Sequence, residues 1–199
     1  MKNWLMIGAL VMLSGACQKA PDTSGPDPAY YRQQEAQVLV DLFDEIIAAH
    51  RMPLPPLPGA QVTDTVGIPL YVADSLYGKK SHWPRHRTIG IGKADPAAQR
   101  HLLKVHNDSL TETVALPTIV VALIKQRGFQ VVTVRRSDHL PQPFVGIGLS
   151  RIIFNRDFTE ACFVHSLACG EDCAEGTLLL AQKQQGRWVI IQRRGLWVA

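Results

Sequence analysis

The last third of the chain alternates apolar runs with turn residues, and this pattern constrains the fold more than any other feature. Residues 145–154 predict one strand, residues 155–157 (Asn-Arg-Asp) have turn chemistry, and residues 160–168 predict the next strand. Residues 177–182 and 187–192 flank a Gln-Gln-Gly turn, and a short apolar run closes the chain. Strands joined by short turns form a consecutive antiparallel meander.

Two runs in this region are apolar on both faces, at residues 178–180 (Leu-Leu-Leu) and 189–191 (Val-Ile-Ile). Such strands are covered on both sides, so we expect both to lie in the centre of the sheet.

A helix precedes these strands. Asp27-Pro28 is typical of a helix start, with a capping side chain followed by proline in the first turn. Apolar residues then recur at steps of three and four up to about His50: Val38, Leu39, Leu42, Phe43, Ile46 and Ile47. The polar residues are expected mostly away from this stripe: Arg32, Gln34, Glu35, Asp41 and Glu45. An amphipathic helix packed on an antiparallel sheet predicts the α+β class, and the sheet is similar to those of cystatin-like and NTF2-like folds.

The middle of the chain predicts shorter elements. A proline-rich stretch at residues 52–58 indicates an extended spacer. Strands are expected at residues 68–73 and 130–134, and a helix at residues 95–106. Residues 118–125 are β-branched and apolar, which favours a strand, although so short a run is also compatible with a buried helix.

The N-terminus has the pattern of an export signal. Lys2 is followed by a short apolar run and then by small residues, so residues 1–16 predict a signal peptide. The sequence Leu-Ser-Gly-Ala-Cys at residues 13–17 resembles the lipobox of bacterial lipoproteins. That resemblance implies that Cys17 becomes a lipidated N-terminus. Gln18, in place of an aspartate, implies the outer membrane rather than the inner one.

The domain boundaries follow from this pattern. Residues 17–28 contain the lipidated cysteine and a polar tether rich in proline, and residues 29–199 suit one domain. The basic side chains between residues 79 and 136 are scattered and lack interleaved aromatics, which argues against a nucleic-acid partner. A solvated surface, anionic lipid and an acidic protein partner all fit this basic region.

Several C-terminal motifs occur together: Leu-Ser-Arg-Ile-Ile-Phe-Asn at 149–155, Cys-Gly-Glu-Asp-Cys at 169–173, Gly-Arg-Trp at 186–188 and Leu-Trp-Val at 196–198. Together they resemble the C-terminal region of a family of uncharacterised exported bacterial lipoproteins common in Bacteroidetes. The resemblance covers roughly residues 145–199 and implies no activity.

Three cysteines follow Cys17. In an oxidising compartment, Cys169 and Cys173 are the expected disulfide, and Cys162 is expected to be a buried free thiol. A metal site formed by Cys169, Cys173 and His165 is a weaker alternative because a fourth ligand is missing. We therefore expect no metal and no cofactor.

The sequence contains no Gly-x-Ser-x-Gly elbow, no His-Glu-x-x-His motif and no phosphate-binding loop. Ser150-Arg151 is a polar pair inside an apolar strand. It predicts either a structural ion pair or, with His165, the wall of a pocket. The leading hypothesis is a lipid-anchored binding or assembly module of the cell envelope that is not an enzyme and has an envelope protein as its partner. The alternative is a small-ligand-binding protein or hydrolase with a pocket on the concave face of the sheet.

Overall fold

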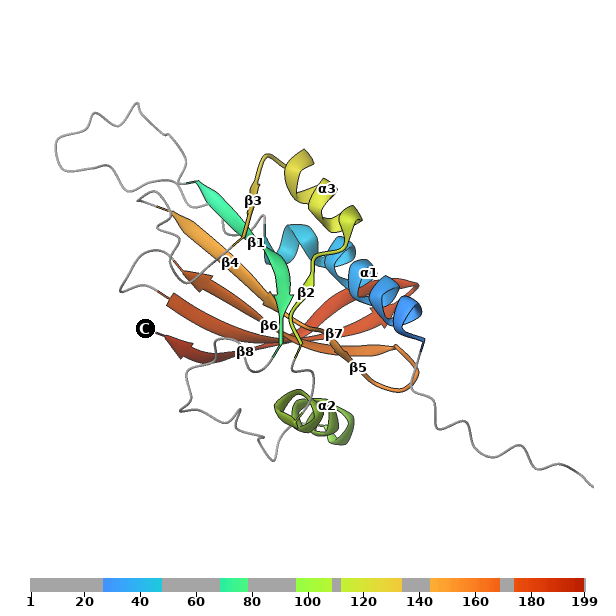
Figure 1. Ribbon diagram of the computed structural model, residues 1–199. Helices are drawn as coiled ribbons and strands as arrows, with labels where there is room; N and C mark the ends of the chain where they lie inside the picture. Colours follow the sequence, from blue (N-terminus) through green and yellow to red (C-terminus); the bar gives the residue numbers. More distant parts are fainter. Residues whose placement is uncertain are drawn as a thin grey trace, which may run out of the picture.

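The computed structural model of the chain describes residues 27–47, 69–78, 96–108, 112–133, 144–168 and 174–198. Within these ranges the elements are, in chain order, α1 (Pro28–Ile46), β1 (Leu70–Tyr77), α2 (Ala97–Asp108), β2 (Val114–Ala115), α3 (Thr118–Gln126), β3 (Gln130–Val132), β4 (Val145–Ser150), β5 (Ile153–Phe154), β6 (Glu160–Ala168), β7 (Ala174–Gln184) and β8 (Arg187–Val198). Helices α1 and α3 lie on one face of the sheet, and α2 lies on the other (Figure 1).

The described strands form one open sheet, crossed in the order β2-β1-β4-β6-β7-β8. Strand β3 extends the edge beside β1, and the short β5 pairs with β6. Strand β1 runs parallel to β3 and β4, whereas the other pairings are antiparallel. The predicted α+β class and the C-terminal meander of β6, β7 and β8 are therefore confirmed.

The β7–β8 hairpin turns at the predicted Gln-Gln-Gly sequence. Gln185 and Gly186 both have positive φ, at 51° and 83°, as a two-residue type I′ hairpin requires. Strand β7 is central, as predicted, but β8 is an edge strand and the expectation for residues 189–191 is wrong. Ile190 and Gln192 pair with β7 while Ile191 is skipped, and this bulge leaves Ile191 40% exposed.

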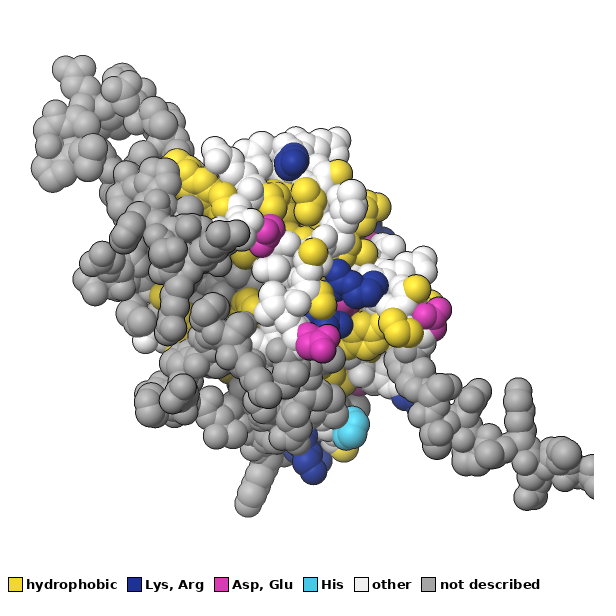
Figure 2. All heavy atoms as spheres, in the orientation of Figure 1, with side chains coloured by type: hydrophobic (Ala, Val, Ile, Leu, Met, Phe, Trp, Pro, Cys, Tyr) yellow, Lys and Arg dark blue, Asp and Glu magenta, His cyan; other side chains and the backbone are white. Residues whose placement is uncertain are grey.

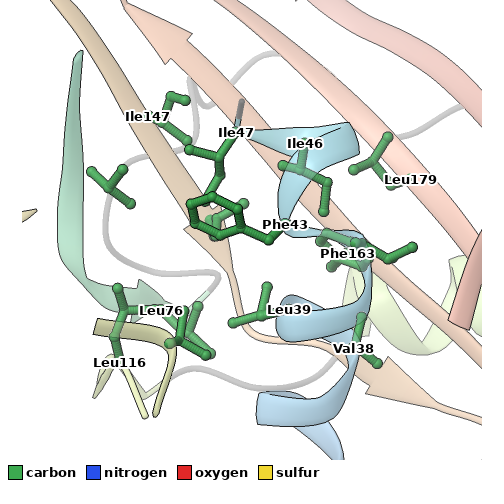
Figure 3. Packing of buried hydrophobic residues seen from close by; sticks show 14 of the residues in the cluster. Val38, Leu39, Phe43, Ile46, Ile47, Leu76, Leu116, Ile147, Phe163 and Leu179 are labelled. Atoms are coloured by element: carbon green, nitrogen blue, oxygen red, sulfur yellow. The ribbon is translucent and has the colours of Figure 1, made fainter. Parts of the chain in front are cut away.

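Helix α1 begins as the sequence predicts. Pro28 occupies its first turn, and the Asp27 carboxylate accepts a hydrogen bond from the Ala29 backbone N–H at 3.0 Å. Its six predicted stripe residues are each at most 2% exposed. They pack on the sheet against residues such as Phe163 and Leu179 (Figure 3). The amphipathic helix is therefore confirmed and supplies one side of the main core.

Residues 118–126 form helix α3, so the favoured strand is wrong. Val120 and Ile124 are fully buried one helical turn apart, while Ala122, which would share their face in a strand, is exposed. Gly128, at φ 80°, ends the helix, and its N–H donates to the Lys125 carbonyl. The burial of two residues four apart is the pattern of a helix, which the β-branched composition alone did not reveal.

The remaining predicted elements appear with shifted ends as β1, α2 and β3. Residues 145–154 do not form one strand, because β4 ends at Ser150 and β5 begins at Ile153. The β6 partners shift across this break: Leu149 pairs with His165, but Ile153 pairs with Cys162. The chain therefore carries an irregular Arg151-Ile152 step inside the sheet.

The second face of the sheet holds a smaller core under α2. Leu102 of this helix is 1% exposed and packs with side chains of β5 to β7, namely Ile153, Cys162, Val164, Leu178 and Leu180. Cys162 is a free thiol and is fully buried, which confirms that prediction.

Candidate functional site

The three residues predicted to line a pocket lie close to the break between β4 and β5. Ser150 ends β4, Arg151 follows it, and His165 lies on β6 opposite Leu149. Ser150 and His165 are 4% and 3% exposed. The other predicted site residues, Cys17, Cys169 and Cys173, lie outside the described residues, so lipidation and the disulfide stay predictions.

Glu35 of α1 is the centre of this region, although the sequence pattern did not select it. Its side chain is fully buried, contrary to the expectation that it lies away from the apolar stripe. One carboxylate oxygen accepts from Arg151 Nε at 2.8 Å and from the Ile152 backbone N–H at 3.2 Å. The other oxygen accepts from Arg32, three residues earlier on α1. Glu35 thus links its own helix to the strand break.

These bonds offset the cost of burying a charge. A buried carboxylate is tolerated when it is paired and its oxygens accept hydrogen bonds. Glu35 has two guanidinium partners, whose side chains are 32% exposed at Arg32 and 11% exposed at Arg151. Arg32 also donates to the Ala115 carbonyl of β2. The group joins α1 to both the short β2 edge and the centre of the sheet, and we call Arg32, Glu35 and Arg151 the Glu35 junction.

Tyr31 closes the junction on one side. Its hydroxyl donates to the Ile152 carbonyl, and the Arg151 guanidinium lies 5.7 Å from the centre of its ring. Burial, and then the negative charge of Glu35, raise the pKa of Tyr31 well above its ordinary value, while Arg151 partly opposes this shift. Tyr31 therefore remains a neutral hydrogen-bond donor.

The Ser150 side chain forms two hydrogen bonds at the strand break. The hydroxyl oxygen accepts from the Val164 backbone N–H at 2.8 Å and donates to the Arg151 carbonyl at 2.9 Å. Val164 lies on β6 between the last residue paired with β4 and the first paired with β5. A serine here replaces backbone pairing that the irregular step interrupts.

A second polar group, formed by Tyr77 and Ser166, lies near the end of β1 on the face of the sheet opposite α1. Burial raises the pKa of Tyr77 to about 12, although a hydrogen bond with the Ser166 side chain acts in the opposite direction.

Burial alone raises the pKa of Cys162 to about 12, so its thiol stays protonated and poorly nucleophilic near neutral pH. These groups fit packing roles.

The described residues contain neither a cluster of metal ligands nor a membrane-spanning helix. Among them, no group of three or more His, Cys, Asp or Glu side chains is arranged to hold a metal ion. No helix in the described ranges has the length and apolar character needed to cross a membrane. Comparison of the chain with protein-family models, with curated proteins and with solved structures found no match.

Proposed function

We propose that this chain is a lipid-anchored protein of the bacterial cell envelope, located at the outer membrane, and that it acts as a binding or assembly module without catalysing a reaction. Cys17 would carry the lipid, and residues 17–28 would tether the domain. The lipobox resemblance and the polar composition of the tether support the anchor.

One observation carries the non-catalytic part of the proposal. The polar residues at the strand break are engaged in internal bonds: Arg151 with Glu35, and Ser150 with the backbone of Val164. The face of the sheet beneath α1 is filled by apolar side chains of the main core (Figure 3). Charged and hydroxyl groups that hold the fold together are poor candidates for binding a substrate, which supports a module that acts through its surface.

We also propose that α1 and the sheet have a cystatin-like or NTF2-like arrangement. A long N-terminal helix lying on an antiparallel meander supports it. The parallel pairings of β1 and the two additional helices, α2 and α3, are features beyond this common arrangement.

Cross-linking of the native protein in its membrane tests the function. The full chain and its Cys17→Ser variant are expressed, cross-linked mildly and recovered, and Cys162→Ala serves as a cysteine variant that retains the anchor. We expect lipid labelling and detergent-phase partitioning in the native chain and in Cys162→Ala, and neither in Cys17→Ser. A stoichiometric envelope protein should accompany the two lipidated forms.

The opposite results are distinct. Unchanged partitioning of Cys17→Ser would refute the anchor. A lipidated protein that is recovered alone, and whose purified domain retains a small molecule or hydrolyses one, would support the ligand-binding or hydrolase alternative instead.

A further inference from the structure

Four aromatic rings gather where α1 begins. Tyr30 and Tyr31 of α1 meet Phe154 of β5 and Phe158 of the following turn, with ring centres 5.0 Å apart for Tyr30–Phe158 and 5.3 Å for Tyr31–Phe154. Phe154 and Phe158 are themselves 5.0 Å apart. We call these four residues the aromatic end of the domain.

The backbone is strained to hold one of these rings. Phe158 has φ 53°, a conformation that residues with a bulky side chain rarely adopt. Its backbone N–H donates to the Asn155 carbonyl at 3.2 Å, which closes the turn. The surrounding rings supply the contacts that keep Phe158 in this conformation.

The cluster reaches the surface instead of ending in the core. Tyr30 is 44% exposed, and among the residues that the structure describes it is one of four exposed large hydrophobic side chains. Figure 2 shows hydrophobic side chains over the start of α1, with charged side chains of both signs beside them. The nearby turn exposes one charge of each sign, Arg156 and Asp157, so the aromatic end carries little net charge.

Tyr30 and Tyr31 of the aromatic end are close in sequence to Cys17, so the length of the connecting segment limits the distance of this end from the proposed lipid anchor. Ten peptide units separate Cys17 from Asp27, the first described residue. Fully extended, they span at most about 35 Å, and as a flexible coil about 17 Å. If Cys17 carries lipid, the aromatic end is therefore the part of the described domain that follows the anchor most directly.

We propose that the aromatic end rests on the phospholipid surface and is a second membrane contact beside the lipid anchor; this inference rests on the proposed function. Tyrosine suits the boundary between headgroups and acyl chains, because its ring is apolar and its hydroxyl remains hydrated. A short tether keeps the local lipid concentration high, so a weak contact is sufficient to orient the domain. The faces carrying α3 and the end of β8 would then remain available to a protein partner.

Hydrogen exchange on tethered protein tests this contact without relying on natural lipidation. Residues 1–17 are replaced by a hexahistidine tag, which leaves every described residue in place. The protein is captured on vesicles of phosphatidylethanolamine and phosphatidylglycerol that contain a nickel-chelating lipid. Exchange of the turn 155–160 and of the first turn of α1 should slow about fivefold relative to the free protein, a factor that corresponds to about 1 kcal/mol.

Two variants identify the side chains responsible. Tyr30→Ser should lose most of this protection, whereas Val198→Ser, which alters an 85% exposed residue of β8, should retain it. The unchanged exchange of β6 and β7 shows that each variant is folded.

Several outcomes would overturn the inference. These are no protection at the aromatic end of the native sequence, protection at α3 or the end of β8 instead, and protection that appears only with vesicles containing native envelope proteins. Failure of the lipid anchor is read separately from Cys17→Ser partitioning, so the two proposals fail by different measurements.

Discussion

Replacing Glu35 by alanine tests whether the Glu35 junction holds α1 to the sheet. The substitution removes the acceptor of three donors, on Arg32, Arg151 and the Ile152 backbone. Breaking a buried ion pair by removing one partner costs about 3–5 kcal/mol. Arg32 is about one-third exposed and regains water, so Arg151 and the Ile152 N–H account for most of the cost. We expect a loss of about 3 kcal/mol, a large part of the roughly 5–15 kcal/mol typical of a domain.

A matched control exists on the same helix. Glu45 pairs with Arg193 of β8 at 2.8 Å, but both side chains are nearly half exposed. Glu45→Ala should therefore cost no more than about 1 kcal/mol. The contrast between two glutamates in salt bridges with similar distances isolates burial as the cause.

A double variant separates charge from packing. Glu35→Leu leaves Arg151 without its carboxylate, whereas Glu35→Leu combined with Arg151→Met removes both charges and keeps the volume filled. The double variant should be more stable than Glu35→Leu alone, because an apolar replacement of a whole buried pair is often neutral.

The free energy of unfolding of each variant is measured by equilibrium unfolding in urea, with circular dichroism and tryptophan fluorescence as the two signals. The protein used is the chain from Gln18 onward. If Glu35→Ala costs no more than Glu45→Ala, or if the double variant is no more stable than Glu35→Leu, the Glu35 junction does not hold α1 to the sheet.

Three other perturbations have defined outcomes. Gly176→Ala places a Cβ 2.2 Å from Trp197 Nε1, so calorimetry should show a loss of about 1–3 kcal/mol that shrinks when Trp197 is also made smaller. Asp41→Ala removes the acceptor of the Trp188 backbone N–H at 2.9 Å and should lower the free energy of unfolding by about 1–3 kcal/mol, whereas Asp41→Asn, which retains an acceptor, should lower it less. For Cys162 the folded-state pKa, about 12, lies above its ordinary value of 9.0. Its contribution to stability is therefore full below pH 9 and is lost as pH rises toward 12, and Cys162→Ala should flatten that decline in urea titrations by up to about 1.4 kcal/mol per pH unit; an unchanged slope would refute the assignment.

The sequence features that predicted the structure best are those that depend on the geometry of one helix or one turn alone. The α1 stripe, the capping Asp27 and the Gln-Gln-Gly turn depend on local geometry, and each is confirmed. The parallel pairing of β1 with β3 and β4 had no such signal, because side-chain alternation reports which face is buried and not which strand lies beside it.

Glu35 shows how a site residue escapes a pattern based on hydrophobicity. It precedes Leu39, Leu42 and Ile46 at steps of four, three and four, so it lies on the buried stripe by position. Because glutamate is polar, the hydrophobic pattern predicted that its side chain would face solvent. Two sequence features together could have predicted the pair. Glu35 occupies a position on the apolar stripe of a helix, and Arg151 lies within a predicted apolar strand, so two opposite charges were both placed where burial was expected.

The break after Ser150 connects this observation to function. A polar Ser-Arg pair inside an apolar strand can be read as a ligand site or as a defect in backbone pairing that side chains repair. Here Ser150 bonds the Val164 N–H, and Arg151 brings the carboxylate that bonds the Ile152 N–H, so both residues compensate an irregular backbone. The same irregular step directs the chain through β5 into the turn that carries Phe158, beside the start of α1. Ser150 and Arg151, which in the sequence were candidates for a ligand site, therefore shape the end of the domain at which α1 begins, the end that we propose rests on the membrane.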